Sequence, residues 1–392
     1  MKVVVNAQLL HTGSNYRGAG VSNYCRNLLT ALAAEAGGHQ LMAFVNDRDF
    51  SCPQGRPGVE LRYTRWPAAA PFPRIVWEQT ALPAALWTDQ ADLVHGLVNT
   101  LPLVTKAPGV VTVHDLSFVR LPERFPLHKR LYLSNLCRAS VNRAKRVIAV
   151  SKQTASDLRT EFGVDSRRVE VVYNGVGGQF RPLPAAEVEG FRERMRLPAR
   201  FLLYVGTLEP RKNLPHLLRS FAGWRAASAT GRDVGLVLAG ARGWHYQEIF
   251  RLVSELGLTS DESGTPSEQE PVVYFPGFLP EQELCLWYNA ASGFVYPSLF
   301  EGFGLPVLEA MASGTPVICS DAPSLQEVAG DAALIVPARD QAALQDAFER
   351  LFSEHGVADS LRERGPRQAE QFSWERAAAE TIDVYETALN GD

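Results

Sequence analysis

Short apolar runs alternate with longer amphipathic stretches along the chain. In the first half, stretches with helical spacing, such as SNYCRNLLTALAAEAG and FPLHKRLYLSNLCRASVNRAK, separate several of the runs. The runs end in turn-forming or polar residues and comprise KVVVN, LMAFVN, LVHGL, GVVTVHD, RVIAVS and VEVVYNG. Strands that are apolar throughout and separated by helices are typical of a parallel sheet with helices on both faces. The pattern therefore predicts an α/β fold.

The same alternation starts again in the second half. The second series of runs comprises FLLYVGTL, VGLVLAG, VVYFPGF, GFVYPS, PVICSD and AALIVP. Between the two series lies VGGQFRPLPAAE, residues 176–187, which has glycines, prolines and no periodicity, as expected of a linker. The length of 392 residues also favours two domains over one. We expect two doubly wound, Rossmann-like domains, over residues 1–180 and 181–372.

A last helix is predicted in SWERAAAETIDVYETAL. Its apolar positions fall mainly on one stripe, formed by Trp374, Ala377, Ala378, Ile382, Tyr385 and Leu389. A helix with such a face must pack on another element, so we expect residues 373–392 to pack back on the first domain. Residues 258–271, which are almost entirely polar, predict an exposed mobile loop.

The composition excludes several classes of protein. Apolar residues make up 46% and charged residues 21%, as in an ordinary globular protein. No apolar run reaches the ~18 residues of a membrane-spanning helix, and MKVVVNAQLL is too short and polar for the core of a signal peptide. The five cysteines lie far apart without a CxxC pair, which indicates neither a zinc site nor a disulfide framework. We expect a cytoplasmic protein.

The net charge of −4 combines two halves of opposite sign, +8 over residues 1–180 and −12 over the remainder. A basic first half indicates an anionic partner, such as phosphate, an acidic lipid surface or nucleic acid. The alternative is two solvated surfaces of opposite sign that attract each other. No motif of nucleic-acid recognition accompanies the basic half.

The basic residues are densest between positions 126 and 146, where no acidic residue occurs. Leucines and a valine are interleaved with the cations Lys129, Arg130, Arg138, Arg143, Lys145 and Arg146. One interpretation is a basic amphipathic helix that lies on an acidic bilayer. The other is a domain helix with one buried stripe and a solvated basic face.

Ligands of open parallel sheets bind beyond the carboxyl ends of the strands, so polar residues in those places are candidates. The loop after the first predicted strand contains Gly13, Gly18 and Gly20, which allow main-chain N–H groups to approach an anion at a helix N-terminus. A plain flexible turn is as good an explanation. His114 follows the run GVVTV, where a reactive and a structural histidine are equally consistent with the pattern.

A third candidate lies in YVGTLEPRKNL. Arg211 and Lys212 follow a strand and precede a helix that we expect to begin near Asn213. Two cations beside a helix N-terminus suit a diphosphate, through fixed charge and the helix dipole. A solvated turn is the alternative, but a basic pair is less expected by chance in an acidic half.

The fourth candidate is YPSLFEGFGLPVLEAMASGTPVICSD. Glu301 lies in a glycine-rich turn, and Glu309 lies about one turn into a helix that we expect to begin near Leu305. Gly302 and Gly304 free the backbone between them for close contact with a ligand. Carboxylates are strong acceptors for O–H donors, so the two could hold hydroxyls at two ends of one molecule. A chance spacing of two glutamates is the alternative.

Taken together, these segments resemble family 4 retaining glycosyltransferases of the GT-B architecture. EGFGLPVLEAMASGTPVI is similar to the E-x7-E region of that family, and GTLEPRKNL to its phosphate-binding turn. RVIAVSKQTASDL with VEVVYNGV resembles the end of its first domain, and FSWERAA its closing helix. The resemblance spans nearly the whole chain in the expected order. GVSNYCRNLL, IVWEQTALP and HDLSF are most similar to mannosyl-type and related bacterial polysaccharide transferases.

The resemblance implies roles for the candidate residues. Arg211 and Lys212 would bind the diphosphate of a nucleotide-sugar donor and stabilise the leaving group. Glu309 would accept from the ribose hydroxyls, Glu301 would hold hydroxyls of the transferred sugar, and His114 would orient that sugar from across a cleft. The other donor-binding positions that the resemblance implies are Gly18, Gly20, Gly206, Thr207, Gly302, Phe303, Gly304 and Leu305.

The resemblance also implies an activity. The chain would be a retaining hexosyltransferase, with an acceptor-binding first domain and a donor-binding second domain. The sub-family similarity favours mannose from GDP-mannose, and a glycan or lipid-linked glycan as acceptor. Alternatives are a UDP- or ADP-glucose-type transferase of the same fold and an inactive nucleotide-sugar-binding protein. The family needs no metal or other cofactor. A cytoplasmic location with peripheral membrane contact through residues 126–146 would fit such an acceptor.

Overall fold

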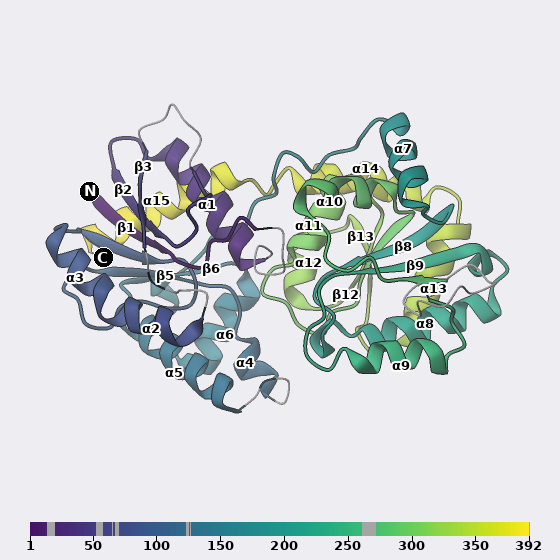
Figure 1. The fold of residues 1–392 in the computed structure, drawn as a ribbon, viewed down its shortest axis with the longest axis horizontal. Helices are drawn as coiled ribbons and strands as arrows, with labels where there is room; N and C mark the ends of the chain where they lie inside the picture. Colours follow the sequence, from purple (N-terminus) through teal and green to yellow (C-terminus); the bar gives the residue numbers. More distant parts are fainter. Residues whose placement is uncertain are drawn as a thin grey trace. The chain divides into compact units, whose positions relative to one another are not determined.

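The chain forms two compact units in a computed structural model (Figure 1). The first unit comprises Met1–Gly175 and Phe372–Asp392, and the second comprises Val176–Gln371. The structure describes residues 1–13, 20–51, 58–64, 66, 70–122, 125, 127–260 and 272–391. Most of the loop expected at 258–271 lies outside the described residues.

The first unit is built on a parallel sheet of seven strands in the order β3-β2-β1-β4-β5-β6-β7. These strands are β1 (Lys2–Ala7), β2 (Gln40–Val45), β3 (Val59–Tyr63), β4 (Leu93–Gly96), β5 (Gly109–Val113), β6 (Arg146–Ala149) and β7 (Val169–Val171). The central strands β4, β5 and β6 are buried along their whole length, because helices cover both faces of the sheet (Figure 1). The strand order reverses direction between β1 and β4, which is where ligands bind in such sheets.

The helices of the first unit follow β1, β3, β5 and β6, and one more helix closes the chain. They are α1 (Val21–Glu35), α2 (Pro71–Gln79), α3 (Ala81–Thr88), α4 (Ser117–Arg120), α5 (Leu127–Arg143), α6 (Lys152–Phe162), the short 3-10 helix η3 (Ser166–Arg168) and α15 (Trp374–Asn390). Ser151 caps the N-terminus of α6, because its hydroxyl accepts a hydrogen bond from the Thr154 N–H.

The last helix, α15, packs against α1 in the first unit. It begins after Ser373, whose hydroxyl accepts from the N–H of Arg376. The buried face differs from the stripe expected from the sequence. Ile382 and Leu389 are only half-buried. The positions that fill the buried face are Trp374, Ala377, Ala378, Thr381, Val384, Tyr385 and Ala388.

The second unit contains a parallel sheet of six strands in the order β10-β9-β8-β11-β12-β13. These strands are β8 (Arg200–Val205), β9 (Val234–Ala239), β10 (Val273–Tyr274), β11 (Gly293–Tyr296), β12 (Val317–Ser320) and β13 (Ala333–Val336). The order reverses between β8 and β11, which pair directly. The loops that follow these two strands therefore meet at one edge of the sheet.

The second unit also has helices on both faces of its sheet (Figure 1). They are α7 (Ala185–Met195), η4 (Pro210–Lys212), α8 (Leu214–Ala227), η5 (Thr230–Asp233), α9 (Gln247–Glu255), α10 (Glu281–Ala290), α11 (Leu305–Ala312), α12 (Pro323–Ala329), α13 (Gln341–Ser353) and α14 (Val357–Ala369). Each unit thus has the doubly wound architecture predicted from the apolar runs.

The basic stretch at 126–146 contains helix α5 and the start of β6. Three of its cations donate hydrogen bonds to main-chain carbonyl oxygens within the first unit, namely Arg138, Arg143 and Arg146. At the N-terminal end of α5, Leu127 and Leu131 are 62% and 48% exposed. Exposed leucines therefore lie at the first turns of α5, and contact of this stretch with a bilayer stays a prediction. Within the described part of the chain, no helix is long and apolar enough to cross a membrane.

Candidate active site

Two loops of the second unit carry most of the predicted site residues. One runs from Gly206 to Asn213 after β8, and the other from Pro297 to Gly304 after β11. Because β8 and β11 are neighbours in the sheet, their carboxyl ends bring these loops together. A main-chain hydrogen bond of 3.0 Å from the Leu299 N–H to the Arg211 carbonyl oxygen joins them directly.

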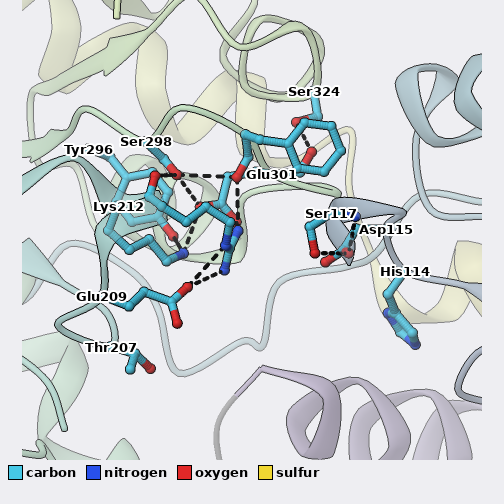
Figure 2. A network of polar contacts seen from close by, with 12 residues as sticks. His114, Asp115, Ser117, Thr207, Glu209, Lys212, Tyr296, Ser298, Glu301 and Ser324 are labelled. Carbon is cyan, nitrogen blue, oxygen red and sulfur yellow. Dashed lines mark hydrogen bonds and ion pairs between the residues drawn. The ribbon is translucent and has the colours of Figure 1, made fainter. Parts of the chain in front are cut away.

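Glu301 lies at the centre of a buried network formed by the two loops (Figure 2). Its Oε2 accepts from Arg211 Nη1 at 2.8 Å. Its Oε1 accepts from Lys212 Nζ at 2.6 Å and from the Ser298 hydroxyl at 2.5 Å. The structure therefore joins three of the predicted residues, Glu301, Arg211 and Lys212, in one cluster.

The same network contains residues that the sequence analysis did not single out. Glu209 is buried and accepts from Arg211 Nε at 3.0 Å. Tyr296 accepts a hydrogen bond from Lys212 Nζ, and its ring lies 4.8 Å below that ammonium group. Both residues lie within the two segments that the sequence analysis quoted, so their position near a strand end was the available signal. Nothing in the sequence indicated that their side chains contact Arg211 and Lys212.

Charge stabilises this cluster in its ionised form. Burial acts to raise the pKa of Glu301, but the adjacent Arg211 and Lys212 outweigh it and bring that pKa down to about 2. Burial, together with the like charge of Arg211, lowers the pKa of Lys212 from its ordinary value. The Glu301 carboxylate is therefore negative at neutral pH and holds two cations in fixed positions.

The turn between Glu301 and α11 has a defined backbone. The Ser324 hydroxyl donates to the carbonyl oxygen of Glu301 at 2.8 Å. Gly304 has φ of 116°, which favours glycine, and a Cβ there would lie 2.5 Å from Leu325 Cδ2, so any other residue would be strained. Gly302 and Phe303 are buried and Leu305 is half-buried.

Helix α11 begins at Leu305, as predicted, with a proline in its first turn. Glu309 lies in this helix and is 8% exposed. Its Oε2 accepts a hydrogen bond of 2.9 Å from the Tyr288 hydroxyl. Glu309 is held by a different partner from Glu301, so the two carboxylates of the E-x7-E segment occupy separate positions on the same turn–helix unit.

The loop after β8 holds the remaining predicted residues of the second unit. Gly206 and Thr207 are half-buried, and the Thr207 carbonyl oxygen accepts from the Tyr204 hydroxyl at 3.1 Å. Arg211 and Lys212 lie in the one-turn helix η4, and α8 starts after Asn213. The basic pair therefore lies directly before a helix N-terminus, as the sequence predicted.

His114 belongs to the first unit and follows β5. Its ring Nε2 lies 2.8 Å from the carbonyl oxygen of Leu97, which can only accept, so Nε2 carries the proton. Its main-chain N–H donates to Asn99 Oδ1 at 3.0 Å. Burial lowers the pKa of His114, which keeps the ring neutral with its lone pair on Nδ1.

The neighbouring Asp115 accepts from the Ser117 N–H and hydroxyl in the first turn of α4 (Figure 2). Gly20 precedes α1 with φ of 55°, a conformation that favours glycine. Gly18, the other predicted residue of that loop, lies outside the described residues. The first unit thus contributes His114 and Gly20 to the predicted set.

Known proteins share both halves of this arrangement. Residues 189–368 match the family described as glycosyl transferases group 1, and residues 18–177 match glycosyltransferase family 4. The chain is 34% identical to O-antigen chain mannosyltransferase B of Escherichia coli over 71% of this chain and 70% of that protein. It is 32% identical to MMP alpha-(1->4)-mannosyltransferase of Mycolicibacterium hassiacum, over 84% of this chain and 79% of that protein.

Solved structures have the same fold. Sucrose-phosphate synthase from Thermosynechococcus elongatus superposes with a TM-score of 0.76 at 23% identity, over the whole of both chains. WaaG, a glycosyltransferase involved in lipopolysaccharide biosynthesis, gives a TM-score of 0.74 at 16% identity over 97% of this chain and 99% of that one. The family matches and the relatives cover both units, and the solved structures share their two-sheet fold. The chain belongs to glycosyltransferase family 4, the hexosyltransferases of GT-B fold.

Proposed function

We propose that the chain is a retaining mannosyltransferase that transfers mannose from GDP-mannose to a glycan or lipid-linked glycan acceptor. The observation that carries the proposal is the buried network of Glu301, Arg211 and Lys212 beside the N-terminus of α11. The relatives named above as mannosyltransferases favour mannose as the sugar. In this proposal the second unit binds the donor and the first unit binds the acceptor.

Arg211 and Lys212 take the donor diphosphate. Each presents a cation that is already held in place by Glu301, so less side-chain entropy is lost when an anion binds. As the bond between the sugar and the diphosphate breaks, negative charge grows on the leaving group. Two preorganised cations in a buried site stabilise that charge strongly.

Glu301 holds the transferred sugar through its remaining acceptor capacity. A carboxylate offers about four lone-pair positions. The described contacts place two donors, Lys212 and Ser298, on Oε1 and one donor, Arg211, on Oε2. Oε2 can therefore accept one further O–H group, such as a hydroxyl of the sugar. Glu309 accepts hydrogen bonds from the ribose hydroxyls of the nucleotide.

Retention follows if the acceptor oxygen attacks C1 on the face from which the diphosphate leaves. The C1–O bond to the diphosphate breaks, the bond from C1 to the acceptor oxygen forms, and an oxygen of the departing phosphate takes the hydroxyl proton. Glu301 is unsuited as a nucleophile because its charge is stabilised by two cations, which also lower its pKa to about 2. Mass spectrometry with a 2-fluoro donor tests this step. A glycosyl adduct on Glu301 would overturn it.

Donor choice is tested by transfer and hydrolysis assays with GDP-mannose, UDP-glucose and ADP-glucose. We expect turnover with GDP-mannose only. Preferred turnover of UDP- or ADP-glucose would support the alternative, a transferase of the same fold with a different donor. Binding of a nucleotide sugar in a thermal-shift assay without turnover of any donor would indicate an inactive binding protein.

Peripheral contact with an anionic bilayer would bring a lipid-linked acceptor to the first unit. We place this contact at the first turns of α5, where Leu127 and Leu131 are exposed. Co-sedimentation with phosphatidylglycerol vesicles tests it. The double variant Leu127→Glu with Leu131→Glu should lose binding, and Met195→Glu, at an exposed position of the second unit, should keep it. Equal binding of both variants would refute this placement.

A further inference from the structure

A polar network of buried, hydrogen-bonded side chains runs through the first unit and ends next to His114. The Tyr385 hydroxyl of α15 lies 2.7 Å from His95 Nδ1, and His95 Nε2 lies 2.8 Å from the Thr112 hydroxyl. The Thr112 hydroxyl lies 3.1 Å from that of Tyr24 in α1. All four side chains are at most 4% exposed. The polar network therefore links the last helix to the centre of the sheet through hydrogen bonds alone.

Two members of the polar network, Tyr24 and Thr112, are linked to His114. The ring of Tyr24 meets the His114 ring edge to face, with centroids 4.5 Å apart. Thr112 precedes His114 by two residues on β5, and its carbonyl oxygen accepts from the Asn99 N–H at 2.8 Å. Asn99 Oδ1 in turn accepts from the main-chain N–H of His114. The ring of His114 thus contacts Tyr24, and its backbone is held by Asn99, which is itself bonded to Thr112.

The polar network has a cost that an apolar core would avoid. Burying an imidazole and three hydroxyls removes their hydrogen bonds to water, and only well-placed partners compensate for that loss. Burial also lowers the pKa of His95 to about 3, so its ring is neutral. A neutral imidazole has one donor and one acceptor, so the hydrogen bonds on its two sides must run in one sense. Such a network fixes side-chain positions more sharply than apolar contacts do.

We infer that α15 positions His114 for sugar transfer through Tyr385, His95, Thr112 and Tyr24. This inference rests on the proposed role of His114 toward the sugar. It assigns the closing helix a task in the reaction besides its packing on α1, and makes these four side chains positioning residues. The orientation of the ring, with Nε2 bound to Leu97 and Nδ1 left as an acceptor, is what the network maintains.

The first experiment breaks the polar network at two points without changing side-chain volume greatly. Tyr385→Phe removes the terminal hydroxyl, and Thr112→Val removes the link between His95 and Tyr24. We expect each to lower kcat about tenfold, because small misplacement of a catalytic group is costly. GDP affinity, measured by calorimetry, should not change because the proposed nucleotide site lies in the second unit. The matched control is Thr381→Val, which removes a buried hydroxyl of α15 that, among the described residues, donates to the Ala377 carbonyl oxygen of its own helix. It should keep full kcat.

The second experiment separates positioning from general loosening of the fold. Tyr385→Phe is combined with His114→Ala, and kcat is measured for both single variants and the double variant. If Tyr385 acts through His114, it has no further effect once His114 is absent. If kcat of the double variant were a further tenfold below that of His114→Ala, the inference would be overturned. Full activity of Tyr385→Phe and Thr112→Val beside an impaired His114→Ala would overturn it as well, while leaving the proposed function intact.

A third measurement reads the His114 ring itself. Nitrogen-15 NMR distinguishes a ring protonated on Nε2 from a mixture of the two neutral forms. We expect the Nε2–H form in the unaltered protein and in Thr381→Val, and a mixture in Tyr24→Leu, which removes the supporting ring. Tyr24→Phe keeps the ring and should show an intermediate loss of kcat. An unaltered His114 signal in Tyr24→Leu would contradict the inference. Full activity of His114→Ala would remove both the inference and the proposed role of His114.

Discussion

Replacement of Glu301 by glutamine tests the electrostatic account of the site most directly. The substitution keeps the shape of the side chain and removes its charge. It leaves Arg211 with Glu209 as its carboxylate partner and leaves Lys212 without one in the network described above. Removing one member of a buried ion pair costs roughly 3–5 kcal/mol because a buried cation stays uncompensated. Since Glu209 still compensates Arg211, we expect the lower end of that range.

The pKa of Glu301 gives a second route to the same magnitude. The folded-state pKa of about 2 lies below the ordinary value of 4.5, so ionised Glu301 stabilises the fold above pH 4.5. The difference corresponds to about 3 kcal/mol at pH 7. As the pH falls from 4.5 toward 2, wild-type Glu301 becomes protonated and this stabilisation is lost. The stabilisation that remains at pH 3.5 is about 2 kcal/mol.

Differential scanning calorimetry of the full chain provides the assay. For a unit of this size, a loss of about 3 kcal/mol lowers Tm of the second unit by roughly 6–12 °C at pH 7. The gap between Glu301→Gln and wild type should narrow at pH 3.5. Glu354→Gln is the control, since its exposed ion pair with Arg350 contributes at most about 1 kcal/mol. An equal Tm for Glu301→Gln and wild type at pH 7, or a gap that does not change with pH, would refute the reasoning.

Three further predictions concern the same unit. Glu309→Gln should weaken GDP binding about tenfold in calorimetry, because a charged acceptor for the ribose is lost, and unchanged affinity would contradict that role. Gly304→Ala should lower the stability of the second unit by about 1–3 kcal/mol in urea unfolding, since the new Cβ meets Leu325 and the backbone is left-handed. Transfer should proceed at the same rate in excess EDTA if Arg211 and Lys212 replace a metal, and a loss that Mg²⁺ or Mn²⁺ restores would show otherwise.

The alternation of apolar runs and helices could be read from the sequence because it is local. Each strand of a buried parallel sheet must be apolar on both faces, so runs such as GVVTV and GFVYP announce β5 and β11 without any knowledge of their neighbours. The start of α11 at Leu305 was also predictable, since a glycine-rich turn and a proline in the first helical turn act within a few residues. The candidate residues followed from the same logic, because strand ends are where ligands bind.

Features that depend on contacts between distant segments were not predictable. The sequence placed Arg211 and Lys212 after one strand and Glu301 after another, but it did not pair them. Local periodicity also gave no sign that three cations of the basic stretch at 126–146 donate to main-chain carbonyl oxygens of distant segments. In α15, helical spacing alone could not decide between Ile382 and Val384 for the buried face.

By itself, then, the sequence determined the two α/β units, their helices and strands, and the residues at the strand ends. Burial and backbone conformation are imposed residue by residue, so the chain carries them as periodicity and turn chemistry. Only the tertiary structure decided that β8 lies beside β11, which joins Arg211 and Lys212 to Glu301, and that Tyr385 reaches His95. Such pairings depend on how the whole sheet and its covering helices are assembled, and hydrogen bonds of under 3 Å form only once that assembly is complete.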